Sequence, residues 1–153
     1  MVQLVLPNDA NTMGNVLGGR VLHWIDLAAA IVAHRHCRTE AVTASMDEVS
    51  FQAPIRVGQL AVITARMTFV GRTSMEIRVD VQSEDLLSGA REQTSTAYLT
   101  FVAVDGKGRP AEVPPLLLET EEEKREARAA EARRAHRLKG RQGVPTSGES
   151  HHA

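Results

Sequence analysis

The sequence predicts an α+β fold in which a curved, mainly antiparallel five-stranded sheet wraps around one long helix. Two observations predict it. One helical segment is apolar nearly all round between Trp24 and Ala33, as expected of a helix inside a protein. One short strand precedes this helix and four stretches with β character follow it, and a single helix can serve five strands only if the sheet curls around it.

The first elements are a short strand, an ordered loop and the long helix. Residues 3–6 form an apolar run that Pro7 stops, and residues 7–19 are rich in Asn and Gly, the composition of a loop. From Gly18 onward helix-forming residues dominate, and basic residues near Arg38 suit a helix C-terminus. We therefore expect a helix of about 18–20 residues, roughly 27–30 Å long, that is buried.

Four strands are predicted after the helix, over residues 41–51, 60–70, 74–83 and 93–104. In the third of these, every second residue is apolar, which is the period of a strand with one covered face. Pro and Gly residues separate the stretches and supply the turns.

A second, charged helix is predicted from Thr120 to about Lys139. Thr120 and Glu123 have the spacing of a capping box. Acidic residues come early and basic residues late, which complements the helix dipole; we interpret the basic residues as a solvated face, with phosphate binding as the alternative. The expected organisation is a domain over residues 1–118, this helix over 119–140, and a tail over 141–153 with the composition of disordered segments.

Composition and charge exclude several classes of protein. The 153 residues make one domain, and with 42% apolar but only 3% aromatic residues its core must consist of small aliphatic side chains. A net charge of −1 offers no field for nucleic acid or an anionic membrane, so neither is an expected partner. The single cysteine and the absence of a signal peptide or long apolar run predict a cytoplasmic protein.

Asp26 is the first candidate site residue. It is the only charged residue between Trp24 and Ala33, and a buried carboxylate costs several kcal/mol unless it is paired or protonated. Asp26 is therefore a candidate catalytic group. The alternative is that it lies on a narrow exposed stripe with His23 and Arg20, or pairs with an arginine of another subunit.

The loop before the helix is the second candidate. Gly18 and Gly19 expose backbone N–H groups at the helix start, where the dipole favours an oxyanion or a phosphate. Ordinary turn and capping chemistry is the alternative. A metal site is not expected, because the spacing of His34 and His36 puts them on opposite faces of the helix. No serine-hydrolase motif is present.

Four segments in order, PNDANTMGNVLGG (7–19), WIDLAAA (24–30), VTASMDEVSFQAPIRVG (42–58) and SMEI (74–77), closely resemble the hotdog-fold acyl-CoA thioesterases of the acyl-CoA hydrolase family. The resemblance covers roughly residues 3–115. It implies the hotdog fold, Asp26 as the catalytic carboxylate, Asn11 as a site residue, and a backbone N–H of Gly18 or Gly19 at the thioester oxygen. It also implies a homodimer with active sites at the subunit interface, commonly assembled into a trimer of dimers.

The expected reaction is hydrolysis of an acyl-CoA thioester to a free acid and CoA, with CoA part of the substrate and no cofactor. Asp26 acts either as a general base or as a nucleophile. Gly18 and Asp26 are eight residues apart, about 12 Å along a helix, whereas groups that act on one carbonyl lie within about 6 Å of each other. We therefore expect Asp26 of one subunit to face Gly18 and Asn11 of its partner.

The nucleotide of CoA requires polar and cationic contacts, for which residues near strand ends are candidates by location: Arg56, Arg72, Thr73 and Ser74. Two other functions remain open. One is a non-catalytic acyl-CoA binding module in which Asp26 anchors the ligand. The other, ranked third, is a hotdog dehydratase, which would need a histidine beside the aspartate, whereas His23 points along the helix.

Overall fold

The structure is a computed structural model that describes residues 1–142, and the predicted tail lies outside the described residues from 143 onward. The chain divides into two compact units, Met1–Leu117 and a unit that begins at Leu118. The first unit contains one helix, one 3-10 turn and five strands: β1 (Val2–Leu4), η1 (Pro7–Asp9), α1 (Gly18–Cys37), β2 (Glu40–Phe51), β3 (Leu60–Val70), β4 (Ser74–Glu84) and β5 (Arg91–Val104). The second contains α2 (Glu121–Gln142).

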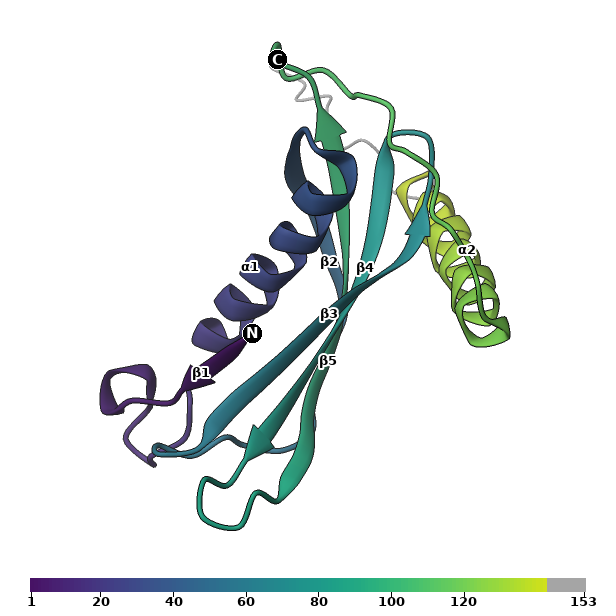
Figure 1. The fold of residues 1–153 in the computed structure, drawn as a ribbon. Helices are drawn as coiled ribbons and strands as arrows, with labels where there is room; N and C mark the ends of the chain where they lie inside the picture. Colours follow the sequence, from purple (N-terminus) through teal and green to yellow (C-terminus); the bar gives the residue numbers. More distant parts are fainter. Residues whose placement is uncertain (143–153) are drawn as a thin grey trace, which may run out of the picture. The chain divides into compact units, whose positions relative to one another are not determined.

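The strands of the first unit form one antiparallel sheet in the order β1-β3-β4-β5-β2. The long strands twist strongly, and α1 runs along one face of the sheet (Figure 1). The predicted α+β architecture is therefore confirmed. β1 and β2 are the two edge strands.

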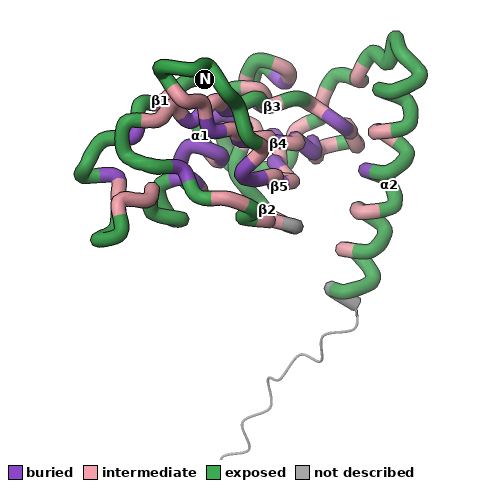
Figure 2. The backbone as a smooth tube through the Cα atoms, turned by 90° about the horizontal axis from the view of Figure 1, so that it is seen from below, coloured by how far each residue is buried: buried purple, intermediate pink, exposed green. Residues whose placement is uncertain are grey.

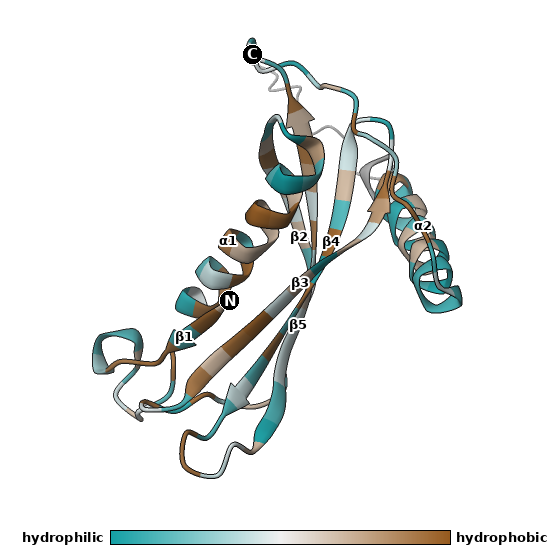
Figure 3. Ribbon diagram, in the orientation of Figure 1, coloured by the Kyte–Doolittle hydropathy of each residue, from teal (hydrophilic) through white to brown (hydrophobic). Residues whose placement is uncertain are grey.

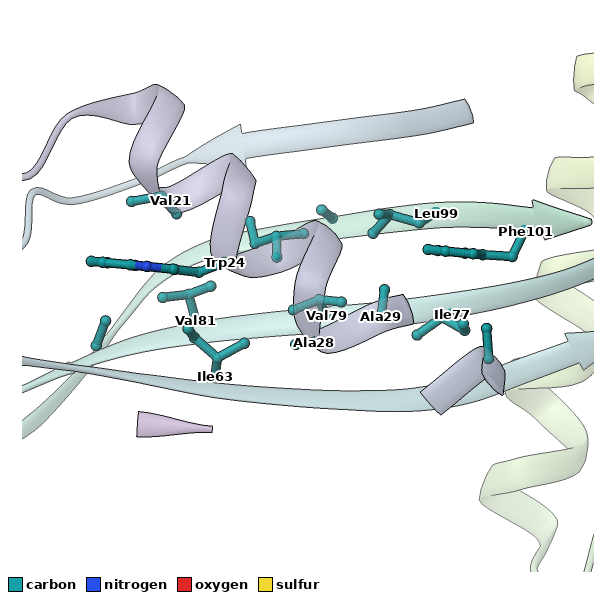
Figure 4. Packing of buried hydrophobic residues seen from close by; sticks show 14 of the residues in the cluster. Val21, Trp24, Ala28, Ala29, Ile63, Ile77, Val79, Val81, Leu99 and Phe101 are labelled. Carbon is teal, nitrogen blue, oxygen red and sulfur yellow. The ribbon is translucent and has the colours of Figure 1, made fainter. Parts of the chain in front are cut away.

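The core lies between α1 and the sheet (Figure 4). Trp24, Ala28 and Ala29 of α1 are buried against the central strands, which contribute Val79 and Leu99 among others. Alanines at the contact let the helix approach the sheet closely, because they add no bulk between the two backbones. The predicted interior of small aliphatic residues is thus confirmed.

Helix α1 is not buried all round, so this expectation was wrong for a single chain. Leu27 and Ile31 are 44% and 47% exposed, and His23 is exposed with them. We call these three residues the outer face of α1. The sheet covers only one side of the helix (Figure 2). Residues three or four positions apart lie on the same side of a helix. Because α1 has apolar residues on every side, those on the side away from the sheet stay uncovered.

One polar side chain of β2, just before a β-bulge, faces α1. Thr43 lies opposite Phe101 in β5, but Ser45 lies opposite the next residue, Thr100, so Ala44 is the extra residue. Phe101 is a core residue on the helix side of the sheet. Its direct partner Thr43 therefore faces the same side, toward α1.

Helix α2 begins with the predicted cap, with one difference. The Glu123 N–H donates to Thr120 Oγ1 at 3.1 Å, but Glu123 Oε2 accepts a hydrogen bond from the N–H of Glu119 rather than of Thr120. The helix reaches Gln142, three residues past the predicted end. Most of its surface is hydrophilic (Figure 3). In the described part of the chain, neither helix combines the length and apolarity that a membrane span requires.

Asp9 fastens the loop between η1 and α1 at both ends. Its side chain is 12% exposed, Oδ1 pairs with Arg20 Nε at 3.2 Å, and Oδ2 accepts a hydrogen bond from the Leu6 N–H at 3.0 Å. Its carbonyl oxygen accepts a hydrogen bond from the Leu17 N–H at 2.8 Å. One residue therefore ties residues 10–17 to the first turn of α1.

We predict that Asp9→Ala lowers the free energy of unfolding by about 2 kcal/mol, because the Leu6 N–H and the Arg20 guanidinium both lose a charged partner. Asp9→Asn keeps an acceptor for Leu6 and is expected to cost less. Urea denaturation at matched protein concentration measures both.

Glu112→Gln is the control for this experiment, because it alters the exposed pair of Arg72 with Glu112, and exposed ion pairs contribute little. If Asp9→Ala were no more destabilising than Glu112→Gln, the role given to Asp9 would be wrong.

Candidate active site

Asp26 is held by a single hydrogen bond from Thr43. The Thr43 hydroxyl donates to Asp26 Oδ1 at 2.8 Å. No other residue in the described chain donates to this carboxylate, so Oδ2 stays open for a reacting group. Asp26 lies at the edge of the outer face of α1 and is half-buried, not enclosed as the sequence suggested. Its charge is tolerated because solvent and the Thr43 hydroxyl both reach it.

Thr43 is a site residue that the sequence analysis missed. Its position in a predicted strand beside other small polar residues gave no signal of its own. Period-two alternation puts Thr43 on the same side of β2 as Ala41, and the bulge at Ala44 begins only after it. A single sequence does not reveal that this position of β2 lies beside Asp26 of α1.

The start of α1 presents two N–H groups that lack backbone acceptors. The N–H groups of Arg20 and Val21 both donate to the carbonyl oxygen of Leu17, at 3.0 and 3.2 Å. Those of Gly18 and Gly19 donate to no backbone carbonyl within residues 1–142. They lie at the positive end of the helix dipole, which favours a developing oxyanion.

Neither glycine is required by the packing of the single chain. A Cβ atom at Gly18 would lie 4.0 Å from Phe51 Cζ, an ordinary contact, and a Cβ atom at Gly19 would have no neighbour within 4 Å. Glycine inside a helix is less favourable than alanine by about 1 kcal/mol. The two glycines therefore leave space at the helix start that this chain does not itself use.

Asn11 lies in the loop that Asp9 fastens, and it presents a hydrogen-bond donor. Its Oδ1 accepts hydrogen bonds from the N–H groups of Met13 and Asn15, at 3.0 and 3.2 Å. These bonds fix the carboxamide, and Nδ2 donates to no atom of residues 1–142. An exposed amide with a fixed orientation is suited to bind a ligand oxygen.

Two hollows flank the helix start. One, of about 370 Å³, is lined by Gly18 and Val21, by residues 51–55, and by Val16 and Ser95. The other, of about 410 Å³, is lined by Leu17, Gly19, Arg20 and His23. The two glycines thus border different hollows. We call the first the acyl pocket, a name whose basis is given below.

The residues suggested for the CoA nucleotide lie at opposite ends of the first unit. Arg56 forms an isolated bridge with Asn15, beside the loop of Asn11. Arg72, Thr73 and Ser74 lie in the turn after β3 and at the start of β4. The 11 residues of β3, roughly 36 Å of strand, separate the two groups. One chain therefore brings only Arg56 near Gly18 and Asn11.

Comparison with known proteins gives consistent results. The Thioesterase superfamily model matches residues 13–90. YkhA of Bacillus subtilis, which is named as an acyl-CoA thioester hydrolase, is 46% identical over 119 residues, 78% of this chain and 69% of that protein. The rat cytosolic acyl coenzyme A thioester hydrolase is 40% identical over 127 residues, which cover 82% of this chain but only 33% of the rat protein.

Solved structures agree. An apo-hexameric acyl-CoA thioesterase superposes with a TM-score of 0.88 at 44% identity, covering 94% of this chain and 92% of the other. The acyl-CoA hydrolase of Staphylococcus aureus has been solved with butyryl coenzyme A and coenzyme A. It superposes with a TM-score of 0.83 at 34% identity, covering 93% of this chain and 89% of the other. With matches of this extent in sequence and in structure, the chain belongs to the Thioesterase superfamily.

Proposed function

We propose that this chain hydrolyses acyl-CoA thioesters to a free carboxylic acid and CoA, with Asp26 as the catalytic carboxylate. The observation that carries the proposal is the hydrogen bond from Thr43 to Asp26, which orients a carboxylate that has one oxygen open. The names of YkhA and of the solved relatives support the substrate class. Several mammalian relatives are named cytosolic, which supports a cytoplasmic location.

A spacing match supports three site residues. The Staphylococcus aureus hydrolase has been solved with alanine in place of an asparagine, an aspartate and a threonine. Along that chain these three residues have the same spacing as Asn11, Asp26 and Thr43 have here. We therefore assign these three residues to one active site.

The reaction requires an attack on the thioester carbonyl carbon and the loss of the CoA thiolate. Asp26 Oδ2 either takes a proton from the attacking water or attacks the carbon itself, forming a mixed anhydride that water then hydrolyses. In both routes the carbon–sulfur bond breaks and the thiolate is protonated. Asp26 is regenerated as a carboxylate at the end.

The negative charge on the carbonyl oxygen requires donors that are already in place. The free N–H groups of Gly18 and Gly19 are such donors, and Asn11 Nδ2 is a third that orients the water or the thioester. Preorganised donors stabilise a transition state because they need no rearrangement when the charge appears. Thioesters are weakly resonance-stabilised, so a carboxylate and these donors suffice.

These groups meet only between two subunits. Gly18 and Asp26 are about 12 Å apart along α1, whereas two groups acting on one carbonyl lie within about 6 Å. We propose that Asp26 of one subunit faces Gly18 and Asn11 of the partner subunit in a homodimer. The exposed Leu27 and Ile31 beside Asp26 supply an apolar surface for that contact.

Further assembly into a trimer of dimers fits the hexameric relatives. In the proposed site Arg56 is the candidate contact for the CoA phosphates. Arg72, Thr73 and Ser74 would reach the same CoA only from another subunit.

We predict that Asp26→Asn lowers kcat by about 10²-fold or more, because the amide is neither a base nor a nucleophile. The variant keeps the size of the side chain and an acceptor for Thr43, so its circular dichroism should match wild type. Release of free thiol from butyryl-CoA measures turnover. A folded Asp26→Asn protein with wild-type turnover would point to a binding module instead.

The Thr43 hydroxyl is expected to position Asp26 rather than to touch substrate. Thr43→Val, which preserves shape, should lower kcat about tenfold, since a hydrogen bond to a charged group contributes about 1.5 kcal/mol. KM should change little. Thr43→Ser should restore most of kcat, because it returns the hydroxyl. Equal activity of the Val and Ser variants would remove this role.

A further inference from the structure

Ser95, a largely buried residue of β5, lines the acyl pocket, and its hydroxyl has no hydrogen-bond partner within residues 1–142. The residue is 2% exposed. Its backbone carbonyl oxygen accepts a hydrogen bond from Gln93 Nε2 at 3.0 Å. The adjacent buried hydroxyl of Thr94 differs, since it donates to the Val81 carbonyl at 3.0 Å. Within the described residues, Thr100 Oγ1 is the fully enclosed side-chain polar atom without a partner, so the Ser95 hydroxyl is not sealed off but borders the pocket that Ser95 lines. A ligand oxygen in this pocket can take the place of solvent at the Ser95 hydroxyl.

The sheet register places Ser95 on the same side as α1. Ser95 lies opposite Val81 of β4, a core residue, and opposite Phe51 of β2. The tip of the Phe51 ring in turn lies beside Gly18. Directly opposed residues have Cβ atoms about 5 Å apart, so Phe51 links the position of Ser95 to the start of α1. Gly18 and Ser95 thus line one pocket.

The pocket is suited to a short acyl chain. If the carbonyl oxygen of the thioester accepts a hydrogen bond from the Gly18 N–H, the acyl chain of the substrate enters the hollow that Gly18 lines. Val21, Ile55 and Pro54 supply apolar walls for methylene groups. In the single chain this hollow has a volume of about 370 Å³, which is enough for a chain of few carbons.

We infer that the Ser95 hydroxyl selects short acyl-CoA substrates that carry a hydroxyl or oxo oxygen on the acyl chain. This inference rests on the proposed thioesterase function. A serine hydroxyl can donate to an oxo oxygen and can also accept from a hydroxyl. An unsubstituted chain buries the same hydroxyl with no partner, so it is bound less well.

The test compares substrates of equal chain length. Free-thiol release gives kcat/KM for 3-hydroxybutyryl-CoA against butyryl-CoA, and for 5-oxohexanoyl-CoA against hexanoyl-CoA. We expect wild type to favour the oxygenated member of at least one pair by roughly three- to tenfold, the effect of one neutral hydrogen bond. Ser95→Ala should bring that ratio to about 1, with kcat/KM for the plain and the oxygenated substrate both measured on the same variant.

Ser83→Ala is the matched control. Ser83 is also a buried serine, lies on the neighbouring strand β4 and does not line the pocket, so its replacement should leave the ratio as in wild type. Ser95→Cys, which keeps the size but weakens hydrogen bonding, serves if Ser95→Ala does not fold.

Three outcomes separate the two proposals. A ratio that falls in the Ser95 variant but not in Ser83→Ala supports the inference. The inference is overturned if the kcat/KM ratio in the Ser95 variant equals that of wild type for both substrate pairs, or if it falls as far in Ser83→Ala as in the Ser95 variant. In either case the proposed hydrolysis still stands. Absence of turnover by wild type with all four substrates would contradict the proposed function, and the inference with it.

Discussion

The packing of α1 against the curved sheet is the constraint on which the rest of the molecule depends. Trp24 and Ile25 on one side of Asp26, and Ala28 and Ala29 on the other, are buried against the strands, so this part of the helix cannot shift. Gly18 and Asp26 therefore stay eight residues apart on one straight helix, about 12 Å along its axis. In the proposed active site the two groups come from different chains, and the exposed Leu27 and Ile31 are the proposed contact surface between them.

Two polar side chains from outside the helix complete this arrangement. Asp9 fixes the loop that carries Asn11, and Thr43 fixes the carboxylate of Asp26. Asp9 lies in a 3-10 turn, and Thr43 lies in the regular part of β2, directly before a β-bulge. The loop, the acyl pocket and Arg56 all lie near the start of α1, so the proposed substrate contacts gather at this end of the first unit.

The elements that depend on local pattern were predictable from the sequence. The strand Leu60–Val70 has the predicted bounds, because Gly58 and Gly71 bracket an alternating run. Helix α1 ends at Cys37, directly before the basic Arg38 that marked its expected C-terminus, because Arg38 adopts a left-handed conformation with φ of 54°. What depends on register or on one-sided packing was not predictable. Thr43 and Ser95 became recognisable only when their strand partners were known, and Asp26 was singled out as a lone charge although it is only half-buried.

Complementation between two inactive variants tests the shared active site most directly. Asn11→Ala and Asp26→Ala proteins are unfolded together and refolded, and native mass spectrometry confirms mixed dimers. If each site takes Asn11 from one subunit and Asp26 from the other, a mixed dimer has one intact site and one doubly altered site. Half of the dimers are mixed, so about one quarter of wild-type activity should return. If both residues came from one chain, every site would carry a lesion, and an inactive mixture would contradict the account.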